Sequence, residues 1–129
     1  TPAQLDAAMR KAGFERQGNQ YEHPDSSFFV EFPPGPLAIG GDFRIQPIEY
    51  FIRRRRVLTL SAIDSCRDRL AAFYFWNDRQ SLRTAVPIAT RCAVDMDRIR
   101  KWSVQEGHEA GFGEFVRELA LRRRSRPAS

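Results

Sequence analysis

The acidic residues that could hold a metal ion lie in two parts of the sequence. Asp64 and Asp68 are one helical turn apart in SAIDSCRDRLAAFYFW, and Glu31 interrupts the apolar segment FFVEF. Carboxylates grouped around a cleft hold Mg²⁺ in phosphoryl and nucleotidyl transfer. Arg67 and Arg69 stand beside the two aspartates, however, and an internal salt-bridge network is the favoured alternative. For Glu31 the favoured alternative is exposure to solvent or pairing with an arginine.

The segment WNDRQ (76–80) gathers polar groups directly after an aromatic run. These groups suit contacts to a phosphate or a base. A corner between two helices, held by Asp-Arg contacts, explains them equally well. The residues predicted to line a cleft are Asp64, Asp68, Arg69, Asp78 and Arg79.

Arginine supplies nearly all of the positive charge. The chain has 21 basic and 16 acidic residues, a net charge of +5, and only two lysines. Guanidinium groups pair bidentately with phosphate, so arginine clusters suit anionic partners. The candidates for binding nucleic acid are Arg53, Arg54, Arg55, Arg56, Arg122, Arg123 and Arg124. The alternatives are solvated basic faces and, at 53–56, a charged hairpin tip or edge that blocks association between sheets.

Several common sites are excluded by residue type and spacing. His23 and His108 stand outside any HxxxH or HExxH pattern, and Cys66 and Cys92 lack metal-ligand spacing. Cys66 falls on the apolar side of a predicted helix, which favours a buried reduced thiol. GxSxG, GxGxxG and GxxxxGK[ST] are absent from the sequence. Apolar runs are far shorter than the roughly 18 residues of a membrane span, so we expect a cytoplasmic protein without membrane contact.

The first half of the chain has the signals of one helix followed by strands and turns. Thr1 and Pro2 suit the start of a helix that Gly13 ends. The Gly18-Asn19 pair predicts a hairpin turn, and PPGP (33–36) predicts a stiff turn that ends a strand. The expected strands cover 14–17, 20–23, 27–32, 37–39, 43–52 (broken at Pro47) and 57–60.

The second half has the periodicity of four helices. They are expected at about 61–76, 79–91, 96–106 and 108–122, and Pro87 is expected to kink or end the second early. Predicted core side chains are Ile63, Cys66, Leu70, Phe73, Met96, Ile99, Trp102, Phe112, Phe115, Val116 and Leu119.

Strands followed by a run of helices indicate an α+β domain, in which an N-terminal helix and a small mixed or antiparallel sheet precede a cluster of four helices. We expect one domain over 1–122, with a sheet part over about 1–60 and a helical part over about 61–122. A basic flexible tail is expected over 123–129.

Two segments, FFVEFPPGPLAIGGD and DSCRDRLAAFYFWNDRQSL, followed by DMDRIRKWSVQEG, resemble an uncharacterised bacterial family with a nucleotidyltransferase-like fold. That family is related to the minimal nucleotidyltransferases and the AbiEii-type toxins. The resemblance covers roughly residues 2–119. It implies that Glu31 matches a metal-binding carboxylate of the sheet. It also implies that Asp68, Arg69, Asp78 and Arg79 belong to the helical half that closes over the cleft.

The chain departs from this family in its catalytic residues. Such proteins usually carry a Gly-Gly or Gly-Ser turn and an Asp-x-Asp strand, and this chain is expected to begin just after them. Gly40-Gly41 is misplaced for that turn, and Asp95-Met96-Asp97 opens a predicted helix. The expected function is therefore a catalytically incomplete nucleotidyltransferase-like domain, which would use Mg²⁺ only if the catalytic half were supplied.

The partners expected from this resemblance are nucleotide or RNA, and a second copy or a partner strand at an exposed sheet edge. Two alternatives stay open. One is a non-enzymatic nucleic-acid-binding module that uses the arginine clusters. The other is a component of a toxin-antitoxin pair.

Overall fold

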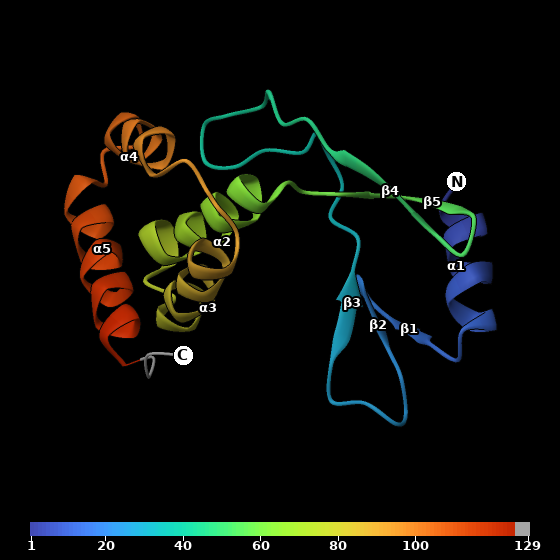
Figure 1. Cartoon of the computed structure of the whole chain (residues 1–129). Helices are drawn as coiled ribbons and strands as arrows, with labels where there is room; N and C mark the ends of the chain where they lie inside the picture. The colour runs from blue at the N-terminus through green and yellow to red at the C-terminus, as the bar shows by residue number, and fades with distance from the viewer. Residues whose placement is uncertain (126–129) are drawn as a thin grey trace. The chain divides into compact units, whose positions relative to one another are not determined.

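The computed structural model describes residues 1–125 and divides the chain into two compact units, Thr1–Pro36 and Leu37–Ser129 (Figure 1). The boundary falls at the end of the PPGP turn, where proline limits regular backbone pairing. The second unit therefore contains strands as well as helices. The division between the two units, after Pro36, lies well before residue 60, at which the sequence predicted the change from the sheet part to the helical part.

The first unit consists of one helix and a three-stranded antiparallel sheet. Thr1 and Gln4 form a capping box at the helix start, as the Thr-Pro pair predicts. Its elements are α1 (Pro2–Lys11), β1 (Glu15–Gln17), β2 (Gln20–Glu22) and β3 (Phe29–Glu31), in the sheet order β1-β2-β3. The predicted hairpin turn at Gly18 is confirmed.

Tyr21 is the buried side chain of this small unit. Its hydroxyl donates a hydrogen bond to Asp6, and its ring packs edge-on against Phe32 at 5.8 Å between centroids. The strand predicted over 27–32 is shorter than expected, because only Phe29–Glu31 pairs with β2.

The second unit opens on a tight turn and a hairpin. Ile39 and Asp42 pair across Gly40-Gly41, and β4 (Ile48–Ile52) runs antiparallel to β5 (Arg55–Thr59). The strands predicted over 37–39 and 43–47 are therefore wrong. Ile39 makes only the single bridge across the turn, and residues 43–47 are unpaired up to Pro47, which has no N–H to donate to a ladder.

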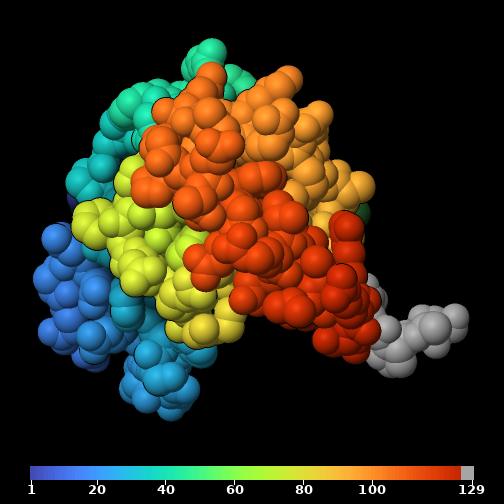
Figure 2. Space-filling view, turned by 90° about the vertical axis from the view of Figure 1, so that its left-hand side faces the viewer, coloured from blue at the N-terminus to red at the C-terminus, as the bar shows by residue number. Residues whose placement is uncertain are grey.

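Four helices complete the described part of the second unit: α2 (Ala62–Trp76), α3 (Arg79–Arg91), α4 (Met96–Gln105) and α5 (Glu109–Arg124). Ser61, Asp78 and Asp95 accept the expected capping hydrogen bonds, and Asn77 ends α2 in the left-handed conformation. The expectation that Pro87 kinks or ends α3 early is corrected in one respect, because the helix continues to Arg91. Figure 2 shows α4 and α5, in orange and red, lying side by side.

The core of this unit lies among its helices. Ten of the eleven predicted core side chains are buried or packed against the buried cluster, among them Cys66, Leu70, Ile99, Phe115 and Leu119. Val116 is the exception, because it is 41% exposed on the outer side of α5. Burial raises the pKa of the Cys66 thiol to about 12, so this buried thiol stays protonated at neutral pH.

The α+β class predicted from the sequence is confirmed, with one helix and strands preceding a run of four helices. Helices and strands are segregated along the chain, as that class requires. Among residues 1–125, every helix is too short or too polar to cross a membrane.

Candidate functional site

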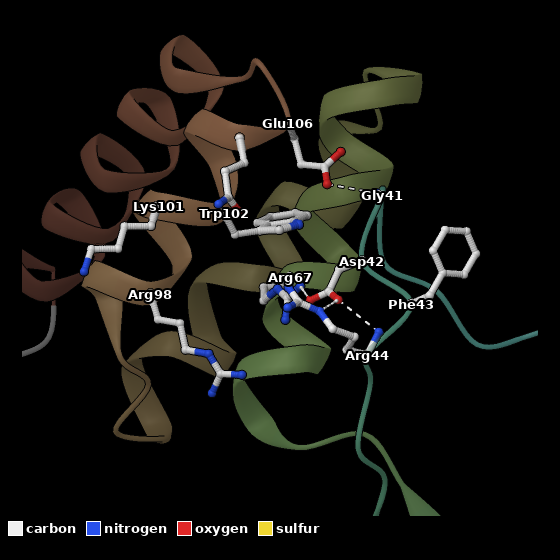
Figure 3. A pocket seen from close by; sticks show the side chains of 10 residues that line it. Gly41, Asp42, Phe43, Arg44, Arg67, Arg98, Lys101, Trp102 and Glu106 are labelled. Carbon is white, nitrogen blue, oxygen red and sulfur yellow. Dashed lines mark hydrogen bonds and ion pairs between the residues drawn. The ribbon is translucent and has the colours of Figure 1, made fainter.

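A cavity of about 580 Å³ opens in the second unit between the 41–44 turn, α2 and α4 (Figure 3). We call it the basic pocket. It is lined by Gly41, Asp42, Phe43, Arg44, Arg67, Arg98, Lys101, Trp102, Gln105 and Glu106.

Arg67 forms the floor of the basic pocket, and its side chain is only 3% exposed. It projects from α2 and donates to Asp64, one turn earlier, at 2.9 Å between Nη1 and Oδ1. Its Nη2 donates to Asp42 Oδ2 at 2.7 Å. A buried guanidinium needs such partners, because removal from water is costly for an unpaired charge. The arginine thereby ties α2 to the 41–44 turn.

Trp102 of α4 lies beside this guanidinium. The Arg67 guanidinium carbon lies 5.1 Å from the centre of the indole ring, and the Tyr74 ring stacks on Trp102 at 5.7 Å. Arg67 Nε and Trp102 Nε1 are both buried without a hydrogen-bond partner in the described residues. A buried donor without a partner costs about 1–3 kcal/mol. Both atoms are inaccessible to solvent, so they lie behind the surface of the basic pocket.

The Gly40-Gly41 turn already holds an anionic group from the protein itself. The Gly41 N–H donates to Glu106 Oε1 at 2.8 Å. Gly40 has a φ of 58°, and a Cβ placed there would lie 2.7 Å from the Glu106 carboxylate. The positive φ favours glycine at position 40, and a Cβ there would also displace the Glu106 carboxylate from the turn.

Asp42 stays ionised well into the acid range. The Arg44 N–H donates to its carboxylate at 3.0 Å, and Arg67 adds a second hydrogen bond. These two contacts lower its pKa to about 2. Asp42 is thus a fixed negative charge that holds Arg67 in place at neutral pH.

The lining of the basic pocket has a positive balance. Its four basic residues are Arg44, Arg67, Arg98 and Lys101, against the two carboxylates Asp42 and Glu106. Counting Asp64 behind Arg67 leaves a net charge of +1. Figure 3 shows the Arg98 side chain extending from α4 below Arg67, while the Lys101 ammonium points away from Arg67. The geometry suits an anionic group held chiefly by guanidinium donors.

The predicted cleft residues are divided among separate contacts. Asp68 pairs with Arg69, which reaches the Ser81 hydroxyl at 3.5 Å, and Ser81 donates to Asp78 at 2.7 Å. The Ser81 hydrogen bonds lower the pKa of Asp78, which also caps α3. This cluster holds the corner between α2 and α3, as the alternative interpretation of the sequence expected. Of the predicted residues, Asp64 alone reaches the basic pocket, through Arg67.

Arg79 and Glu31 lie elsewhere. Arg79 pairs with Glu114 of α5, and this hydrogen bond raises the pKa of Arg79 and lowers that of Glu114. Glu31 ends β3 in the first unit, where its side chain is exposed as the simpler interpretation expected. Within residues 1–125, no three His, Cys, Asp or Glu side chains gather closely enough to hold a metal ion.

The two arginine clusters differ in their setting. Arg53 and Arg54 form the turn of the β4–β5 hairpin, and Arg55 and Arg56 begin β5. The other cluster, Arg122, Arg123 and Arg124, forms the last turn of α5. The tail predicted from 123 is corrected at its start, because Arg123 and Arg124 are helical. Residues 126–129 of that tail lie outside the described residues.

Sequence reasoning missed most of the residues of the basic pocket. One signal was present: Arg67 follows Ile63 by four residues and precedes Leu70 by three, so it belongs to the apolar stripe of α2. A charged residue in such a stripe indicates a buried ion pair. By contrast, Asp42 and Arg44 come from a turn whose approach to α2 has no local signal.

Comparisons with protein families, curated proteins and solved structures found no significant match. The resemblance to nucleotidyltransferases therefore stays a prediction from the sequence. The interpretation of the basic pocket rests on its own geometry.

Proposed function

We propose that the chain is a binding module whose basic pocket holds the phosphate group of a ligand. The observation that supports this best is the gathering of Arg44, Arg67, Arg98 and Lys101 on the lining of one cavity, which has only Asp42 and Glu106 as negative charges. Three of these four side chains are arginines, whose guanidinium groups pair bidentately with phosphate. A phosphate group carries several acceptor oxygens and a compensating negative charge.

The more exposed basic residues explain how a phosphate would be attracted. Arg98 and Arg44 present guanidinium groups at the pocket, and charge-assisted hydrogen bonds to phosphate are about twice as strong as neutral ones. Glu106 opposes them, because its carboxylate occupies the Gly41 N–H and reduces the positive field. We therefore expect moderate affinity that falls as salt is added.

Phosphate binding would suit the nucleotide or RNA partner that the sequence predicted, and it requires no catalytic carboxylate. The incomplete nucleotidyltransferase remains the prediction that the resemblance makes. We prefer a binding function, because the charges on the lining of the basic pocket favour an anionic ligand.

The chain offers a built-in reporter for this proposal. Trp76 is 82% exposed at the end of α2, whereas Trp102 is 5% exposed in the pocket wall. The substitution Trp76→Phe leaves Trp102 as the only indole, so its emission reports on the pocket. The titrants are inorganic phosphate, a nucleoside monophosphate and a 5′-phosphorylated oligonucleotide, with chloride at matched ionic strength as the control.

A saturable change in Trp102 emission with at least one phosphate-bearing titrant, absent with chloride, is the expected result. The relative affinities of the three titrants then show whether a free phosphate, a nucleotide or a nucleic-acid end is preferred. A response that is linear, or identical to that of chloride, contradicts the proposal.

A further inference from the structure

A second feature of the chain, separate from the basic pocket, is the hairpin formed by residues 48–59. We call it the arginine hairpin. Its large apolar side chains are unusually exposed, with Phe51 at 69%, Ile52 at 59% and Tyr50 and Leu58 both at 53%. A two-stranded hairpin is marginally stable alone in water. Grouped exposed apolar side chains of this kind mark interaction sites.

The turn of the arginine hairpin is strained. Ile52 pairs with Arg55, so the loop has two residues, Arg53 and Arg54, with φ values of 49° and 64°. A loop with both residues at positive φ strongly prefers Asn-Gly, whose residues adopt this conformation at little cost. Arginine at both positions opposes the local preference of the backbone. Such strain is typical of positions kept for a function.

The tip also carries uncompensated positive charge. Arg53, Arg54, Arg55 and Arg56 follow one another, and Glu49 is the only acidic residue of the hairpin. Glu49 pairs with Arg56 at 3.5 Å, and the described residues give no ion pair to the other three arginines. Three free guanidinium groups at one tip form a strong site for a polyanion.

The register places arginines and aromatic side chains together on both faces. Phe51 lies directly opposite Arg56, and Ile52 lies opposite Arg55. Side chains at directly opposed positions share a face, so Tyr50 falls on the Arg55 face through the two-residue period of the strand. Each face therefore combines one exposed ring with one arginine at the tip.

We propose that the arginine hairpin binds single-stranded nucleic acid. The guanidinium groups would pair with phosphates, and the rings of Tyr50 and Phe51 would stack on unpaired bases. Unpaired bases explain the rings better than a duplex does, because stacked base pairs hide the faces that aromatic side chains contact. This site is independent of phosphate binding in the basic pocket.

The arginines of the hairpin and the distribution of its side chains over both faces argue against two other partners, a membrane surface and a second copy of the chain. A membrane surface favours an element with one apolar and one polar face, whereas apolar and charged side chains occur on both faces of this hairpin. Pairing of a second copy along β5 would involve an edge that carries Arg55 and Arg56, and charged residues on an edge oppose such pairing.

The turn allows a test in which binding is expected to fall without any loss of stability. Arg53→Asn/Arg54→Gly installs the preferred turn, so the urea midpoint of the full chain should stay equal or rise. Anisotropy of a labelled single-stranded 20-mer should show an affinity loss of about tenfold at 50 mM salt. Losing two phosphate contacts should also lower the slope of log affinity against log salt by about 1.4.

A second variant separates stacking from charge. Phe51→Thr keeps a residue that favours strands but removes one ring, so affinity should fall about fivefold or more with an unchanged salt slope. The matched control is Arg83→Gln/Arg91→Gln, which removes two exposed arginines from α3 and the same net charge. Its affinity should stay within about threefold of the parent chain.

Three results would overturn the proposal. The first is equal binding by the parent and Arg53→Asn/Arg54→Gly, or an equal loss in the α3 control. The second is duplex binding as tight as single-strand binding. The third is binding to vesicles of anionic phospholipid without binding to the oligonucleotide.

Discussion

At the scale of single residues, Arg67 connects two carboxylates while its own side chain is nearly inaccessible to water. Arg67→Met would leave Asp64 buried without its counter-charge, and breaking a buried pair costs about 3–5 kcal/mol. Arg69→Met is the matched control on the same helix. Its pair with Asp68 is about 40% exposed on both sides, so the loss should be at most about 1 kcal/mol. Urea unfolding measures both, and equal losses would contradict the role given to Arg67.

The lowered pKa of Asp42 predicts how the stability of the chain depends on pH. Its pKa in the folded chain, about 2, lies below its ordinary value of 3.8, so its stabilising contribution is complete above pH 4 to 5. This contribution is lost as the pH falls through 3.8 toward 2. The urea midpoints of the parent chain and Asp42→Asn should therefore differ at pH 6 and converge near pH 2. Parallel curves would show that the carboxylate does not anchor Arg67.

Other carboxylates add to the acid sensitivity of the parent chain. The pKa values of Asp6, Asp78 and Glu114 are also lowered, by hydrogen bonds from Tyr21, Ser81 and Arg79 respectively. Asp42→Asn leaves these groups unchanged. The difference between the two curves therefore isolates the contribution of Asp42.

The sequence predicted local contacts better than distant ones. Asp78 was recognised as a cap and corner residue because its partners follow within three positions. Asp42 was missed because its partner Arg67 is 25 positions away, and no local pattern reports such a pairing.

At the scale of elements, α3 tolerates a proline in its interior. Pro87 has no N–H for the Arg83 carbonyl, yet the helix continues because its apolar face, including Leu82, Val86 and Ala89, is buried. Burial of that face outweighs the lost hydrogen bond, which explains why the expected early end did not occur.

Replacement of this proline should stabilise the chain. Pro87→Ala restores the N–H and should raise the free energy of unfolding by about 1–3 kcal/mol, less any loss from ring packing. The exposed position 84 gives a control: Thr84→Ala should change stability by about 0.5 kcal/mol or less. Urea unfolding distinguishes them, and a loss of stability in Pro87→Ala would contradict this explanation.

Most helices could be predicted because their caps and periodicity lie within each segment. The strands were harder. The sequence of residues 43–47 favours an extended backbone. A strand also needs a second strand to pair with, and the paired strand β4 begins only after Pro47. The short sheet of the first unit was recognised through its turn residues.

At the scale of the whole molecule, the α+β class and the order of elements followed from the sequence, and the division at Pro36 coincides with the predicted PPGP turn. The residues of the candidate site could not be predicted from the sequence. The basic pocket combines a turn with two helices, so its residues meet only after the second unit has folded.

The measurement that tests the central claim most directly compares two neighbouring arginines of α4. Arg98 lines the basic pocket, whereas Arg100 pairs with Asp97 and is not among the lining residues. Each is changed to Gln in the Trp76→Phe chain, and phosphate is titrated while Trp102 emission is recorded. The two variants lose the same charge from the same helix.

Arg98→Gln removes a charge-assisted hydrogen bond, so phosphate affinity should fall about tenfold, while Arg100→Gln should stay within about twofold. Equal urea midpoints for the two variants would show that the difference in phosphate affinity does not arise from a difference in stability. Equal affinities in the two variants, or parental affinity in Arg98→Gln, would contradict the assignment of the basic pocket as a phosphate site.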